Sequence, residues 1–137
     1  MNVMNQEQEK RKIKVVFSNV IGNKPPIALE IYDDLDVIQE LLKCDAIDIV
    51  RRKIWGKTYC FIVDDEGLLK KDPILSGWCL DTPHGNLYGN LIITGVEDDE
   101  GDLTSLSNAD VNKIFGSAVD FIFKGPKPEY KLFVLGV

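Results

Sequence analysis

Residues 89–116, GNLIITGVEDDEGDLTSLSNADVNKIFG, carry the signals for a strand, an acidic turn and a helix in succession. The apolar run at the start predicts a strand, which ends in the acidic residues before Gly101. Ser107 predicts the N-cap of the helix, Asp110 the acidic member of a capping box, and Gly116 the helix end. The predicted buried face of this helix comprises Val111, Ile114 and Phe115. Strand and helix signals so close together indicate a mixed fold.

Two strands and another helix are predicted before this stretch. IKVVFSNV is rich in β-branched residues and predicts a strand over about 13–20. After the loop IGNKPP, the alternating run IALEIY at 27–32 predicts a second strand, antiparallel to the first. Residues 34–43 change to helical spacing, with an N-cap from Asp33 or Asp34. The apolar stripe of this helix comprises Leu35, Ile38, Leu41 and Leu42.

A β-hairpin is predicted over residues 46–63, AIDIVRRKIWGKTYCFIV. Gly56 and Lys57 lie between its two strand-like runs and predict a tight turn. We therefore expect Trp55 and Tyr59 to lie close to each other across the hairpin.

The tetrapeptide DDEG occurs twice, at 64–67 and at 98–101. An EF-hand loop with its glycine at position 6 needs an oxygen ligand at position 1, where this chain has Ile62 or Val96. Both loops also follow predicted strands rather than helices. We therefore expect hairpin turns in which glycine takes φ > 0, and no metal or cofactor. Hairpin tips offer no cleft for acid–base chemistry, and no catalytic residue is predicted.

The predicted fold class is α+β, a mostly antiparallel sheet of about six or seven strands with two helices in a single domain. Residues 1–11 are polar and predict a flexible leader, and residues 12–117 form the α+β domain. Residues 118–137 hold two apolar runs separated by KGPKPE. An exposed apolar tail promotes aggregation, so this C-terminal strand extension is expected to pack on the sheet or on a partner.

Composition indicates a cytoplasmic protein that does not bind nucleic acid or membrane. The sequence has no apolar run long enough to span a bilayer and no signal peptide. Cys44, Cys60 and Cys79 form no CxxC pair and are predicted to be buried, reduced thiols. The net charge of −6 disfavours binding to polyanions. The basic clusters at 10–14 and 51–53 are interpreted as solvated faces.

The candidate binding site lies in SGWCLDTPHGNLYGN, residues 76–90. Residues 72–88 are the least regular part of the chain, and long irregular segments in compact domains are often functional. Aromatic surface and hydrogen-bonding groups gather there, which suits a ligand or partner. The alternative is that the aromatic residues are core anchors and the polar residues belong to turns. The predicted ligand- or partner-binding residues are Trp78, Asp81, His84, Asn86 and Tyr88.

The order of strand, VDDEG, the strand GNLIITGV, EDDEG and the helix beginning SNADV also carries a resemblance. This pattern, over about residues 13–115, resembles a small bacterial family catalogued as domain of unknown function 3846. The family is met in phages, plasmids and conjugative elements. The resemblance implies a compact α+β domain with an accessory role on a mobile element, and it implies no enzymatic activity. The C-terminal twenty residues fall outside it.

Two hypotheses of function follow. The first is a non-catalytic interaction or regulatory module of a mobile element or phage that binds a protein partner, with a variant in which it counters host defence. A dimer through the C-terminal strand belongs to this hypothesis. The second is a small-molecule binder or minor enzyme that uses the 76–90 loop.

Overall fold

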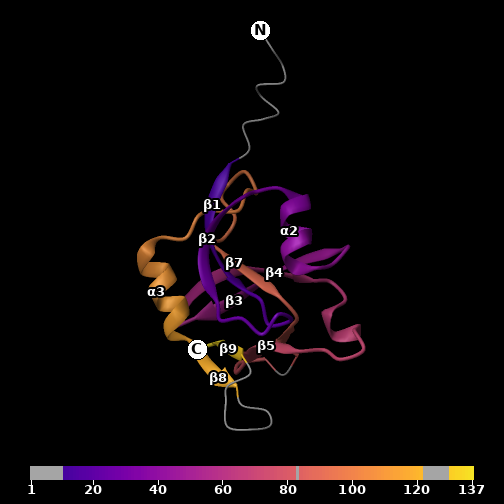
Figure 1. The fold of residues 1–137 in the computed structure, drawn as a ribbon. Helices are drawn as coiled ribbons and strands as arrows, with labels where there is room; N and C mark the ends of the chain where they lie inside the picture. The colour runs from indigo at the N-terminus through magenta and orange to yellow at the C-terminus, as the bar shows by residue number, and fades with distance from the viewer. Residues whose placement is uncertain (1–10, 83, 122–129) are drawn as a thin grey trace.

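The computed structural model describes residues 11–82, 84–121 and 130–137, which form two β-sheets and two α-helices (Figure 1). This arrangement confirms the predicted α+β class, although the described part of the chain has nine strands in two sheets rather than about six or seven in one. Most of the predicted leader and the predicted KGPKPE turn lie outside the described residues.

The first sheet has five strands in the order β2-β1-β7-β4-β3, and every neighbouring pair is antiparallel. The predicted antiparallel pairing of the first two strands is therefore confirmed. A bridge between Gly95 and Thr104 continues the pairing past the end of β7. The strands are β1 (Lys12–Ser18), β2 (Ile27–Tyr32), β3 (Ile47–Ile54), β4 (Lys57–Asp64) and β7 (Leu91–Thr94).

The β3–β4 hairpin turns one residue earlier than predicted. Ile54 pairs with Lys57, so Trp55 and Gly56 form the two-residue turn, with φ of 49° and 80°. Two positive φ values match the twist of the flanking strands. The predicted contact between Trp55 and Tyr59 is wrong, because Tyr59 pairs with Arg52 and is buried while Trp55 lies exposed at the turn.

The second sheet has four strands in the order β6-β5-β9-β8. Strands β5 and β9 are parallel, and the other pairs are antiparallel. Residues 72–88 therefore contain two strands, and the prediction that this stretch is irregular is wrong in that part. The strands are β5 (Leu75–Cys79), β6 (Leu87–Tyr88), β8 (Ala118–Phe121) and β9 (Tyr130–Leu135).

Both helices begin at the predicted caps. Helix α2 (Leu35–Leu42) follows Asp34, whose carboxylate accepts a hydrogen bond from Asp36 N at 2.9 Å. Helix α3 (Asn108–Gly116) has the predicted capping box. Asp110 N donates to Ser107 Oγ at 3.0 Å, and Ser107 N donates back to Asp110 Oδ2 at 3.2 Å. Local capping chemistry therefore places both helix starts.

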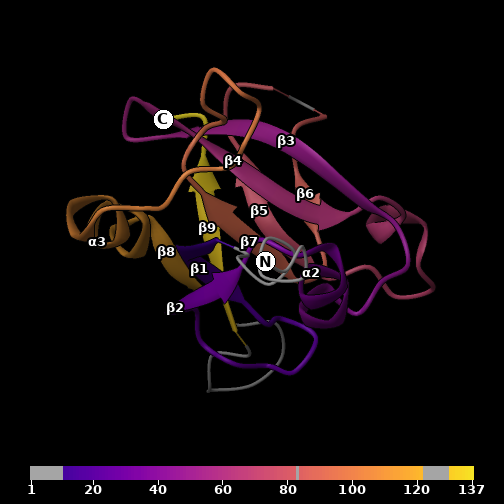
Figure 2. The ribbon, with the colours of Figure 1, turned by 90° about the horizontal axis from the view of Figure 1, so that it is seen from above.

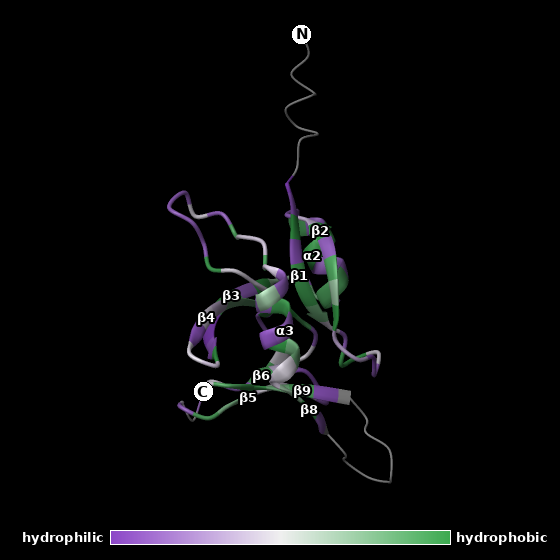
Figure 3. Ribbon diagram, turned by 90° about the vertical axis from the view of Figure 1, so that its left-hand side faces the viewer, coloured by the Kyte–Doolittle hydropathy of each residue, from purple (hydrophilic) through white to green (hydrophobic). Residues whose placement is uncertain are grey.

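The three central strands of the first sheet, β1, β7 and β4, bury both of their faces, whereas the edge strands β2 and β3 are largely exposed. Alternate residues of the central strands point to two separate cores, so Phe61 and Ile93 lie in one while Ile62 and Ile92 lie in the other. One core lies between the two sheets and includes α3, and the other is covered by α2. Figure 2 shows the two helices well separated across the first sheet, and Figure 3 shows hydrophobic colour in both sheets and on both helices.

The two DDEG loops differ from each other. In the second, Asp98 accepts hydrogen bonds from Glu100 N and Asp102 N, and Gly101 has φ of 83°, as predicted. The first loop is not a hairpin turn, because it leads from β4 in the first sheet to β5 in the second. Its Gly67 has no positive φ and begins the 3-10 helix η1 (Gly67–Leu69). A Cβ there would lie 2.7 Å from the Tyr88 carbonyl oxygen.

Gly67→Ala is expected to lower the free energy of unfolding by about 1–3 kcal/mol, because the new methyl group meets a backbone atom that cannot rotate away. Urea unfolding followed by circular dichroism measures the change. Gly116→Ala is the matched control, because nothing beyond its chain neighbours and its own helix backbone lies within 4 Å of its Cβ position, and a gain of about 0.4–1 kcal/mol is expected. Equal effects at the two positions would contradict the close approach.

Candidate functional site

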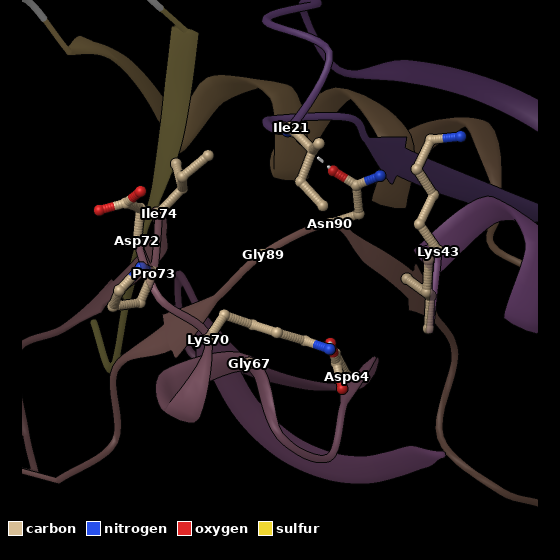
Figure 4. A pocket seen from close by; sticks show the side chains of 11 residues that line it. Ile21, Lys43, Asp64, Gly67, Lys70, Asp72, Pro73, Ile74, Gly89 and Asn90 are labelled. Carbon is tan, nitrogen blue, oxygen red and sulfur yellow. Dashed lines mark hydrogen bonds and ion pairs between the residues drawn. The ribbon is translucent and has the colours of Figure 1, made fainter. Parts of the chain in front are cut away.

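One cavity of about 380 Å³ lies where the α2 end, the first DDEG loop and residues 72–90 meet (Figure 4). Its walls are mainly apolar, and its charged side chains balance, with two lysines and two aspartates. Figure 4 shows Lys70 reaching toward Asp64 and Asn90 lying beside Ile21. The lining residues with apolar side chains are Ile21, Leu42, Pro73 and Ile74, and the charged ones are Lys43, Asp64, Lys70 and Asp72.

The central polar groups of this first cavity are already bound to the protein. Asn90 is buried, its Oδ1 accepts from Ile21 N at 3.0 Å, and its Nδ2 donates to the Leu41 carbonyl at 3.1 Å. Asp64 accepts from Glu66 N at 2.9 Å and forms an ion pair with Lys70 at 3.5 Å. These contacts hold loops together, so the cavity has few polar groups left to orient a ligand.

A second cavity of about 330 Å³ lies between the β3–β4 hairpin and the segment that follows β5. Two predicted site residues, Asp81 and His84, line it together with Arg51, Arg52 and Lys53. The basic residues 51–53, for which the sequence predicts a solvated face, therefore lie beside Asp81 and His84 of the predicted binding segment. Thr58, Thr82 and Gly85 complete the lining.

The other three predicted site residues lie elsewhere. Trp78 is exposed on β5, and neither cavity described above includes it. Asn86 Oδ1 accepts a hydrogen bond from Cys79 N at 2.8 Å, which closes the turn before β6. Tyr88 is half-buried in β6, with its carbonyl against Gly67. The structure thus brings Asp81 and His84 together and separates them from an exposed tryptophan and two residues with structural contacts.

The three cysteines are free thiols, and their surroundings disfavour the thiolate. Burial, followed by a hydrogen bond to Glu97, raises the pKa of Cys60 to about 11. Burial and then Asp81 likewise raise the pKa of Cys79, whose Sγ donates to Asp81 Oδ1 at 3.0 Å. Burial and the charge of Asp64 raise the pKa of Cys44. Protonated thiols are weak nucleophiles, which fits the predicted structural role.

The hydrogen bond from the Cys79 thiol, aided by one from Thr82, lowers the pKa of Asp81. Asp81 therefore carries its negative charge at the edge of the second cavity while bound to two neutral donors. Across the described ranges, no group of three or more His, Cys, Asp or Glu side chains is placed to hold a metal ion. No helix in those ranges is long and apolar enough to cross a bilayer.

The fold is a small α+β domain in which the described residues show no metal cluster and no activated thiol, either in the two cavities described above or elsewhere. Residues 13–117 match the model of a family described as Domain of unknown function (DUF3846), and the chain belongs to this family. The resemblance drawn from the two acidic loops is therefore confirmed. Comparison with curated proteins and with solved structures gives no match.

Proposed function

We propose that this chain is a non-catalytic interaction module that binds a protein partner. In this proposal it is a cytoplasmic accessory protein of a phage or other mobile element, and one variant has it counter host defence by occupying a defence protein. Membership of a family without an assigned activity is compatible with such a role. The proposal rests mainly on one surface of the second sheet.

The outer face of the second sheet carries exposed apolar side chains in β5 and β8, the strands on either side of β9. Trp78 is 52% exposed, and Val119 is 43% exposed. Trp78 pairs with Val134 and Val119 pairs with Leu132, so these four side chains lie on the same face, opposite the core residue Phe133, although Leu132 is itself buried. Leu80, 53% exposed, follows β5 and extends the surface. We call Trp78, Leu80, Val119 and Val134 the outer patch.

An exposed tryptophan among aliphatic side chains is typical of the anchor of a protein interface. The outer patch lies on a sheet face and lines neither of the two cavities, which favours a protein partner over a small ligand. Strand β9 has neighbours on both edges, so a dimer formed by strand pairing at the C-terminal extension would use β8. Such a dimer would leave the outer patch free for another partner.

The test is photocrosslinking in the native host with a benzophenone amino acid placed at position 78 or 119. We expect both positions to give the same discrete crosslinked protein. The matched control is position 69, because Leu69 is 79% exposed and lies on η1, outside the outer patch. With the purified partner, Trp78→Ser is expected to weaken binding about 30-fold, as for an interface hot spot, and Leu69→Ser to leave it unchanged. Crosslinks of equal yield at all three positions, or equal affinity of the two variants for the partner, would exclude the outer patch as the partner-binding surface.

A second candidate function, binding of a small molecule by residues 76–90, is favoured by one observation. This segment lines both cavities, through Gly89 and Asn90 in the first and through residues 81, 82, 84 and 85 in the second. The two cavities differ in the hydrogen-bond donors that they leave unused, and this difference decides which ligand chemistry to expect.

A further inference from the structure

The second cavity gathers positive charge in a protein of net charge −6. Three of its lining residues, Arg51, Arg52 and Lys53, are consecutive in the edge strand β3, so Arg52 lies on one face and Arg51 and Lys53 on the other, and Thr58 lies opposite Lys53 in the hairpin. The facing wall comes from the segment after β5 and adds Thr82 and His84. Cations and hydroxyl groups from two separate segments therefore surround one concave site.

Arg52 is held in a fixed orientation. Its Nε donates to the Gly85 carbonyl at 2.9 Å, and its Nη1 donates to the Arg51 carbonyl at 2.7 Å. These two bonds leave Nη2 without an acceptor among the residues that the structure describes. An arginine whose fork is already ordered loses little conformational freedom when it binds an anion. Arg52 thus provides a pre-oriented donor between the two walls.

Lys53 supplies a second unused cation. Its ammonium group makes no hydrogen bond or ion pair within the described ranges, and its positive charge contributes to the lowered pKa of Asp81. Arg51 differs, because its guanidinium is bound to Glu97 at 2.9 Å, which neutralises most of its charge. The negative charge of Asp81 repels an incoming anion, but the two positive charges of Arg52 and Lys53 exceed it. The site therefore retains a net positive charge with free donors.

Resting on the second candidate function, we infer that this cavity binds a small molecule through a phosphoryl group. A phosphoryl group has three oxygens and accepts donors from several directions, as the guanidinium, ammonium and hydroxyl groups around this cavity offer them. A carboxylate has two oxygens in one plane and would leave some of these donors unused. The first cavity has no such set, since no guanidinium or hydroxyl group lines it and Lys70 is paired with Asp64, which leaves Lys43 as its other cation.

The concave shape and the acidic surface favour a small ligand over a nucleic acid. A volume of about 330 Å³ lies at the small end of ligand pockets. An extended polyanion would need several phosphate contacts along a basic surface, and the remaining net charge of the protein opposes that. Single-stranded DNA is therefore the competing ligand that the experiment must exclude.

The experiment titrates the full chain with inorganic phosphate and with adenosine 5′-diphosphate, followed by calorimetry and by backbone amide NMR shifts. We expect saturable binding, with shifts at Arg52, Lys53 and Gly85. Lys53→Gln is expected to weaken binding about 10-fold, the loss of one charge-assisted contact. The matched control is Lys24→Gln, which removes the same charge from the exposed loop between β1 and β2. It is expected to leave the affinity unchanged.

Tighter binding of the nucleotide than of phosphate would mean that the cavity also contacts the nucleoside, and equal binding would indicate a site for the free anion. Both results support a phosphoryl site. The inference is overturned if neither compound gives saturable shifts, if acetate binds as well as phosphate, or if both lysine variants lose affinity equally. Tighter binding of a single-stranded oligonucleotide than of the nucleotide would also overturn it. None of these results depends on the outer patch, so the protein-partner proposal fails or holds separately.

Discussion

Phe133→Ala is expected to lower the free energy of unfolding by about 3–5 kcal/mol. Phe133 is fully buried in the middle of β9, paired with Gly77 on one side and Ala118 on the other. Its ring lies in the core between the two sheets, and removal would leave a cavity that the paired backbones cannot close. Because a domain of this size has a total stability of about 5–15 kcal/mol, the variant should be close to unfolding at room temperature.

Urea unfolding monitored by circular dichroism measures this loss, with Val119→Ala as the control. Val119 lies in the same sheet but is exposed on the outer patch, so its truncation should cost less than about 0.5 kcal/mol. A comparable loss in the two variants would mean that β9 does not complete the core. Removal of residues 118–137 should then leave a folded domain, whereas the structure leads us to expect an unfolded one.

Asp110→Asn is expected to cost about 2 kcal/mol at pH 7. Asp110 accepts hydrogen bonds from Lys57 Nζ and from the Tyr59 hydroxyl, both at 2.8 Å, and it completes the capping box with Ser107. Burial would raise the pKa of Asp110, but hydrogen bonds from Lys57, Tyr59 and Ser107 outweigh it and hold the pKa well below its ordinary range. The ionised carboxylate therefore links α3 to the β3–β4 hairpin.

The sign of the pH dependence follows from this lowered pKa. The folded state favours the ionised form, so the stabilisation is fully present above the unfolded-state pKa of about 4. It is lost as the pH falls from there through the lower folded-state value. The difference in the free energy of unfolding between the wild type and Asp110→Asn should narrow as the pH falls from 7 to 2.5 without closing, because the folded-state pKa lies below this range. Asp99→Asn, at an exposed loop position, should give a difference near zero at pH 7. If the difference in the free energy of unfolding between the wild type and Asp110→Asn stayed constant with pH, the ionised Asp110 carboxylate would not be the source of the stabilisation.

The hydrogen bond between Tyr59 and Asp110 also predicts that the free energy of unfolding falls at high pH. Burial, and then the hydrogen bond to Asp110, raise the pKa of the Tyr59 hydroxyl above its ordinary value. The folded state therefore favours neutral Tyr59, and this stabilisation is present below the unfolded-state pKa of about 10. It is lost as the pH rises further, because only the unfolded chain ionises readily. Tyr59→Phe should remove this dependence and retain the burial of the ring.

The sequence predicted best those elements that local chemistry determines. Both helices are predictable from apolar spacing together with their caps, Asp33 or Asp34 for α2 and Ser107 for α3, because capping bonds join residues two or three positions apart. Strands β1, β2, β4 and β7 were predictable because their apolar, β-branched runs contribute to the buried faces of the first sheet. The positive φ of Gly101 was likewise correct, since its turn is closed by Asp98 alone.

The errors fall where distant residues decide the structure. Strand β5 contains Gly77 and follows a proline, so nothing in its local sequence indicates its pairing with β9. Gly67 was assigned to a turn by its acidic neighbours, but its requirement comes from the carbonyl of Tyr88. The β5–β9 pairing and the close approach at Gly67 both depend on how the second sheet packs, and local sequence propensities do not predict this packing.

The candidate site was predicted in part for the same reason. Asp81 and His84 were selected from the irregular segment, but Arg52 was missed because the basic run was treated as one solvated face. A signal was present, since alternation along β3 places Arg52 on the side of Val50 and Ile54, toward the core. Such a charged residue usually has a specific acceptor, which the structure identifies as the Gly85 carbonyl.

The family match ends earlier in the chain than the folded domain does. The match ends at residue 117, whereas β8 and β9 lie beyond it and complete the second sheet. Residues 13–117 alone would expose the inner face of β5 and the cluster that Phe133 and Leu135 cover. An expression study of this chain therefore needs residues 118–137 to obtain a stable protein.

The parallel pairing of β5 with β9 also has a consequence for the folding rate. The β1–β2 and β3–β4 pairs close over short loops, but Gly77 and Phe133 are far apart in the chain and their pairing closes a long one. Loop-closure entropy makes such contacts slow to form. The two hairpins can thus form early. The pairing of β1 with β7, which joins Val16 to Ile93, closes an even longer loop than the pairing of β5 with β9, so both long-range pairings are expected to form late. Aggregation during refolding should therefore trace to the strands that await these pairings, β7 in the first sheet and β5 in the second.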